Sequence, residues 1–240
     1  MLDDLAERLA TPVVDLPSNF MLDPATYERG TELGFDGLDF YVCGRAGALG
    51  EVDAGVVAAA IVFFNPAMIR ERWERGRAVM APLEAAAAFA GCLESWSDGH
   101  LEESPDHARL AELLGRVLTN ANPAGAPLFA AWLAMPEPAE PAALMMHRLY
   151  LLRELRGAMH GCAVLAAGLD PLVALLIRTP FMAPIFGWTE PYPEVDLARE
   201  AWEGAEAATN QAVGRMLKVL PDRDREELAE LLEQVHAGVH

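Results

Sequence analysis

The chain has 240 residues, of which 52% are hydrophobic, and its 36 acidic side chains outnumber the 18 basic ones to give a formal net charge of −18. An acidic excess of this size repels phosphate backbones, so we do not expect nucleic acid as a partner. Every apolar run is shorter than the ~18 residues that a membrane-spanning helix needs, and no membrane partner is expected either.

Residues that start and end helices divide the first half of the chain into short helices. Asp23-Pro24 combines an N-cap with a proline at the first helical position and predicts a helix to about Val42. A glycine-rich turn over 44–50 should end this helix, and an apolar helix over 53–64 should stop at Asn65-Pro66. Further helices are expected over 66–75, 82–97, 105–120 and 127–135.

The second half contains the longest predicted helix. The proline-rich segment Pro136-Glu137-Pro138 is the best candidate for a boundary between two parts of the fold, and an apolar helix over 141–167 follows it. A helix over 171–178 and a loop rich in proline and aromatic residues over 180–193 come next. Two charged helices are expected last, over 194–219 and 222–236, and the final one is amphipathic.

This pattern predicts an all-α fold without strands. We expect a compact multi-helix bundle of two packed lobes, 1–135 and 139–240, around a long buried helix near 141–167; one continuous domain is the alternative. Cys43, Cys92 and Cys162 are scattered without a C-x-x-C pair. Such a pattern is typical of reduced cysteines in a cytoplasmic protein.

The helix over 141–167 has apolar residues on every side, which is typical of a buried helix, and yet it also carries several charged residues. At 100° per residue, Arg153, Arg156 and His160 fall within an arc of about 60°, whereas His147 and Glu154 share another direction. Buried charge is costly unless it is paired or used, and two arginines with a histidine suit a carboxylate or phosphate group. The alternative is a solvated face, or pairing with some of the many acidic residues.

Other candidate residues lie outside this helix. Arg45, in the glycine-rich segment, is a candidate for gripping an anion, with an exposed hinge residue as the alternative. Asn65 could orient a ligand or form an ordinary turn, and Trp188 could line a pocket or plug the helix ends. No metal site is expected, because His and carboxylate residues lack the i, i+3 or i+4 spacing. No cofactor is predicted, with haem at His147 or His160 as a less favoured option.

Five segments together resemble the SalK-like family. The stretch 151–160, LLRELRGAMH, is similar to its L-L-R-E-H-R-G-D-G-H signature, although Leu155 and Ala158 replace His and Asp. The other similar segments are 44–50, 64–66, 127–131 and 187–189. This family comprises uncharacterised actinobacterial helical proteins of helix-turn-helix-like type, some encoded in natural-product gene clusters. The resemblance implies a helical fold and a role in actinobacterial specialised metabolism.

These observations favour a small-molecule binding protein or enzyme of specialised metabolism. Its pocket should lie beside the helix over 141–167 under the loop over 180–193. We expect Arg153 and Arg156 to hold an anionic group, Glu154 to orient an Arg or His, and His160 to transfer a proton. The alternative is a regulator or interaction protein derived from a winged-helix ancestor that does not bind DNA and that forms a homodimer through its C-terminal helix.

Overall fold

A computed structural model describes residues 2–239, which form twelve α-helices and no β-strand, so the predicted all-α fold is confirmed. Four short 3-10 segments join or extend the helices. The helices are α1 (Leu2–Leu22), α2 (Pro24–Glu32), α3 (Asp39–Ala46), α4 (Ala54–Ala60), α5 (Pro66–Arg77), α6 (Pro82–His100), α7 (Asp106–Thr119), α8 (Pro127–Trp132), α9 (Pro141–Ala166), α10 (Pro171–Arg178), α11 (Arg199–Met216) and α12 (Asp222–Gly238).

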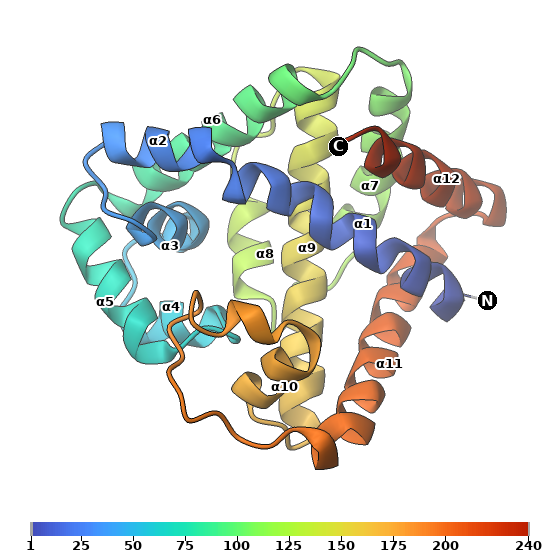
Figure 1. Cartoon of the computed structure of the whole chain (residues 1–240). Coiled ribbons are helices and arrows are strands. Elements are labelled where there is room, and N and C mark those ends of the chain that lie inside the picture. The colour runs from blue at the N-terminus through green and yellow to red at the C-terminus, as the bar shows by residue number, and fades with distance from the viewer. Residues whose placement is uncertain (1, 240) are drawn as a thin grey trace.

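Helix α9 runs through the centre of the molecule, with α1 crossing it and α11 beside it (Figure 1). It packs against helices from both halves of the chain: α1, α6, α7, α8, α10 and α11. Most of its large apolar side chains are buried and they point in all directions, among them Met146, Leu149, Leu152 and Leu155; Leu165 near its end is exposed. A helix that is apolar all round is stable only inside a protein, which confirms the prediction of a long buried helix.

Three predicted helix starts are built as the Asx-Pro dipeptides indicate. The side chains of Asp23, Asn65 and Asp170 accept hydrogen bonds from backbone N–H groups of α2, α5 and α10. The proline that follows each cap has no N–H to satisfy and favours the helical φ angle.

The predicted helix from Asp23 to about Val42 is wrong. Helix α2 ends at Glu32 and α3 begins only at Asp39. Between them Gly34 and Gly37 adopt φ angles of 95° and 49°, which end a right-handed helix. Smaller differences occur at α4, which stops at Ala60, and at α11, which begins at Arg199 after a 3-10 turn.

The glycines of 44–50 also behave differently from the prediction, because α3 continues through Gly44, Arg45 and Ala46. A Cβ on Gly44 would lie 2.7 Å from the Phe89 side chain, and one on Gly47 would lie 2.1 Å from the carbonyl oxygen of Pro82. These glycines therefore allow α3 to approach α6 closely, and they place Arg45 on a helix.

One hydrophobic cluster contains side chains from both sides of the 136–138 boundary, including Leu5, Trp73, Trp132, Leu152 and Leu232. The division into lobes 1–135 and 139–240 stays a prediction. Within residues 2–239, no single helix has the length and apolar composition to cross a membrane. Two sharply bent pairs, α5 with α6 and α9 with α10, reach that length and composition only together.

Candidate functional site

A cavity of about 310 Å³ lies beside α9, between α1, α3, the turn after α4, α10 and the segment that follows α10. This volume lies at the lower end of the range for small-molecule sites. Its wall is mostly apolar and includes five aromatic residues: Tyr27, Tyr41, Phe63, Phe64 and Phe186. Five of the predicted site residues also line it: Arg45, Arg153, Glu154, Arg156 and His160.

Glu154 is the shared counter-ion of two arginines on the cavity wall. Its carboxylate receives two hydrogen bonds from Arg45, from Nε and from one terminal nitrogen, each 2.9 Å long. Arg153 donates a third at 2.9 Å, and the side chain of Glu154 is only 2% exposed. Burial raises the pKa of Glu154, but the charges of Arg45 and Arg153 outweigh this effect, so the pKa is lowered and the group stays ionised. Ionised Glu154 can orient the arginines but cannot donate a proton.

Arg45 is fixed by groups other than Glu154 as well. Its second terminal nitrogen donates to the Tyr41 hydroxyl at 3.2 Å, and its carbonyl oxygen accepts from the Trp132 indole at 2.8 Å. Burial lowers the pKa of the guanidinium, but the charge of Glu154 outweighs it and the pKa is raised. All three of its nitrogens thus have partners, and Arg45 acts mainly as a support.

A second ionic cluster joins α9 to α10 and α11. Glu206 of α11 accepts from Arg156 at 3.2 Å and from Arg178 at 3.3 Å, and it lies 3.4 Å from Nδ1 of His160. No pattern in the sequence pointed to Glu206, Arg178 or Thr209. Their role depends on the packing of α11 beside α9, which no local pattern reveals.

His160 is held in one orientation by two neighbours. Its Nδ1 lies 3.2 Å from the hydroxyl oxygen of Thr209, and its ring stacks on Phe63 with centroids 5.3 Å apart. Its pKa is lowered to about 4, mainly by burial; the charge of Glu206 opposes the shift, and those of Arg156 and Arg178 add to it. His160 is therefore neutral at pH 7.

Two residues that line the cavity each have a buried hydrogen-bond donor without an acceptor among residues 2–239. These donors are the Nε–H groups of Arg153 and Arg156. Leaving a buried donor unsatisfied costs about 1–3 kcal/mol, so an acceptor near these two groups would be stabilising. The charged groups around the cavity also favour an anion. Two glutamates are paired with four arginines there, which leaves an excess of two positive charges; the residues are Glu154, Glu206, Arg45, Arg153, Arg156 and Arg178.

The other three predicted site residues lie outside the cavity lining. Asn65 caps α5 through its side chain, and the Trp188 indole donates to the Phe63 carbonyl at 2.9 Å. His147 is 1% exposed and packs edge-on against Trp132. Asn65 and Trp188 thus support the cavity wall near Phe63 without touching the cavity. Across residues 2–239, no three His, Cys, Asp or Glu side chains are grouped as metal ligands.

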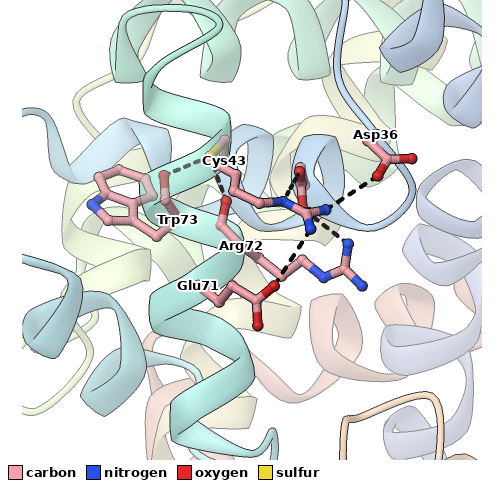
Figure 2. Close-up of polar contacts among 7 residues, drawn as sticks. Asp36, Cys43, Glu71, Arg72 and Trp73 are labelled. Carbon is pink, nitrogen blue, oxygen red and sulfur yellow. Dashed lines mark hydrogen bonds and ion pairs between the residues drawn. The ribbon is translucent and has the colours of Figure 1, made fainter.

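Helix α5 is the helix richest in arginine among the described residues, and Figure 2 shows polar contacts around Arg72, Glu71 and Asp36. Arg72 donates to Asp39 at 3.1 Å, and Arg75 bonds Asp39, Asp36 and Glu71. Asp39 itself is only 3% exposed. The network therefore joins α5 to α3 and the loop before it, and it neutralises these two guanidinium groups.

A family model described as a helix-turn-helix family matches residues 6–195, most of the chain. The chain belongs to this helix-turn-helix family. In this family member the matched region contains the five cavity residues predicted from sequence, whereas Glu206 and Thr209 lie beyond it. No curated protein and no solved structure matches the chain. The finer resemblance to SalK-like proteins and an actinobacterial origin stay predictions.

Proposed function

We propose that this helix-turn-helix family member binds a small, largely apolar molecule that carries a carboxylate. The observation that carries the proposal is the pair of buried Nε–H groups on Arg153 and Arg156, which have no acceptor among the described residues and belong to two residues that line one cavity. A carboxylate has two oxygens that can accept from both, and such charge-assisted bonds are about twice as strong as neutral ones.

Electrostatics supports the same ligand. The whole chain has a net charge of −18, yet the groups around the cavity carry an excess of two positive charges. An apolar wall strengthens the attraction between these charges and a bound anion, because the local dielectric constant is lower than in water. Aromatic residues on the wall favour a flat apolar body.

We propose the cytoplasm and specialised metabolism as the setting. All three cysteines are free, as in proteins of reducing compartments, and the resemblance to SalK-like proteins supports the second part. Haem at His147 or His160 is a less favoured alternative.

A ligand-responsive regulator is the second candidate, because the chain belongs to a helix-turn-helix family. Direct DNA binding is not part of this candidate, since Arg72 and Arg75 of the arginine-rich helix are paired with carboxylates. A homodimer through α12 would have to use its charged side. Its apolar residues Leu228 and Leu232 are already buried against other helices of the same chain, among them α1 and α7.

Isothermal titration calorimetry with four carboxylates and their neutral amides tests the proposal. The acids are benzoate, 4-methylbenzoate, 2-naphthoate and octanoate. We expect at least one acid to bind, and at least about tenfold more tightly than its amide, because one charge-assisted bond contributes ~1.5–3 kcal/mol.

Two variants and a control make the test specific. Arg153→Gln and Arg156→Gln should each weaken binding of the acid by about tenfold or more, whereas Arg215→Gln on the exposed side of α11 should not. Equal binding of acid and amide, or unchanged affinity in both variants, would contradict the proposal.

A further inference from the structure

The ring of His160 presents one nitrogen to the cavity in a defined state. Thr209 donates its only hydroxyl proton to the carbonyl oxygen of Ala205, at 2.7 Å. Its oxygen can therefore only accept from His160, which puts the imidazole proton on Nδ1. Glu206, 3.4 Å from Nδ1, favours the same tautomer because a carboxylate also only accepts.

This assignment leaves Nε2 of His160 as a bare acceptor. Nε2 makes no hydrogen bond to any residue of 2–239, and the ring lines the cavity. Burial, with smaller contributions from the charges of Arg156 and Arg178, lowers the pKa of the ring to about 4, so Nε2 stays unprotonated at pH 7. Because the protein supplies no donor to Nε2, this nitrogen can accept a hydrogen bond from a molecule bound in the cavity.

The arginine donors and this acceptor share one face of α9. Arg153, Arg156, Gly157 and His160 are spaced i, i+3, i+4 and i+7. Along the helix axis, His160 lies ~6 Å beyond Arg156 and ~10 Å beyond Arg153. Gly157 lies between them, and a Cβ on it would meet no atom within 4 Å. The surface of α9 at Gly157, between the arginine donors and the histidine acceptor, therefore leaves space for a ligand.

We infer that the ligand is an aromatic hydroxy acid. Its carboxylate is held by Arg153 and Arg156, its ring lies over Gly157, and its hydroxyl donates to Nε2 of His160. This inference rests on the proposed function and adds the second polar group and its place. Hydroxyl and carboxylate on opposite sides of one ring match the spacing along α9.

The first test needs only the wild-type protein. Calorimetry with 3- and 4-hydroxybenzoate is compared with 3- and 4-methylbenzoate, in which a methyl group of similar size replaces the hydroxyl. We expect one hydroxybenzoate to bind at least tenfold more tightly than its methyl counterpart, because only the hydroxyl satisfies Nε2.

Variants then assign the preference to this site. His160→Phe should remove it, since phenylalanine has no acceptor, whereas His160→Gln should retain part of it through the amide oxygen. Gly157→Leu should abolish binding of both hydroxybenzoates and both methylbenzoates, because the leucine side chain would occupy the space over residue 157. The loss should occur without loss of stability, since leucine favours helix over glycine.

The outcomes separate the two proposals. If wild type binds the hydroxybenzoates and the methylbenzoates equally, the inference about His160 is wrong and the proposed function stands. The inference is also wrong if His160→Phe keeps the preference. If no carboxylate binds, the proposed function itself fails.

Discussion

Glu154 and Arg45 form the most deeply buried ion pair at the cavity, with side chains 2% and 12% exposed. Removing one partner of such a pair leaves the other charge buried without compensation. The pair therefore fixes α3 against α9 at the position where the cavity begins.

We predict that Glu154→Gln destabilises the protein by about 3 kcal/mol, because Arg45 would lose a charged bidentate partner. Urea denaturation measures the effect. The control Glu226→Gln removes a half-exposed partner of Arg8 and should cost less than ~1 kcal/mol. Equal losses in both variants would show that the buried pair contributes no more than a surface one.

His147 should make stability depend on pH. Burial lowers its pKa to about 4, and the nearby charges are Glu137, which opposes the shift, and Arg148, which adds to it. The unfolded chain, with a histidine pKa of ~6.5, then binds more protons between pH 6.5 and 4, so stability falls as the pH falls through this window.

We predict that His147→Met reduces the loss of stability between pH 7 and pH 5 by about 2 kcal/mol, since methionine cannot titrate. Urea denaturation of both proteins at the two pH values is the measurement. An unchanged pH dependence in the variant would mean that His147 does not carry this effect.

At the residue scale, the sequence predicted the site residues on α9 and Arg45, but neither the pairing of Arg45 with Glu154 nor the acidic partner of Arg156 and His160. The charges within an apolar helix indicated Arg153, Glu154, Arg156 and His160, because buried charge is expensive wherever the helix lies. Glu206, the partner of Arg156 and His160, lies 50 residues from Arg156 and follows no recognisable pattern. Which arginine nitrogens remain free depends on these partners and could not be predicted.

At the scale of elements, the contact between α3 and α6 decides where Arg45 lies. Glycines allow both turns and close helix packing, and the sequence alone could not separate these causes. Gly34, Gly37 and Gly50 turn the chain with positive φ angles, whereas Gly44 and Gly47 remove side chains from a crowded contact.

We predict that Gly47→Ala destabilises the protein by about 1–3 kcal/mol, because its Cβ would collide with the backbone of Pro82. Gly91→Ala is the matched substitution in the middle of α6. A Cβ there meets nothing, and alanine favours helix, so a gain of up to ~1 kcal/mol is expected. Thermal unfolding distinguishes the two, and a stabilised Gly47→Ala variant would contradict this account of the contact.

At the scale of the whole molecule, one hydrophobic cluster runs from α1 to α12 around α9. The sequence predicted this central helix because its apolar residues point in every direction. It could not predict that α12 would bury its apolar side on α1 and α7, since an amphipathic helix can equally bind a second chain.

We therefore expect the chain to unfold in one transition. Circular dichroism and tryptophan fluorescence should give the same urea midpoint, since Trp73, Trp132, Trp188 and Trp202 lie on both sides of the 136–138 boundary. Leu232→Ala, which removes a fully buried side chain, should shift both curves together. Two separated transitions would instead support independent lobes over 1–135 and 139–240.

The proposed function depends on the Nε–H groups of Arg153 and Arg156 donating hydrogen bonds to a bound carboxylate. Proton–nitrogen spectra of the arginine Nε–H groups, recorded as 4-methylbenzoate is added, test it most directly. Arg153→Gln and Arg156→Gln assign the two resonances. We predict that both move downfield as the acid binds, whereas those of Arg8 and Arg109, which already bond to glutamates, do not. Saturating acid that leaves both resonances unmoved, or that moves only those of exposed arginines, would contradict the proposed function.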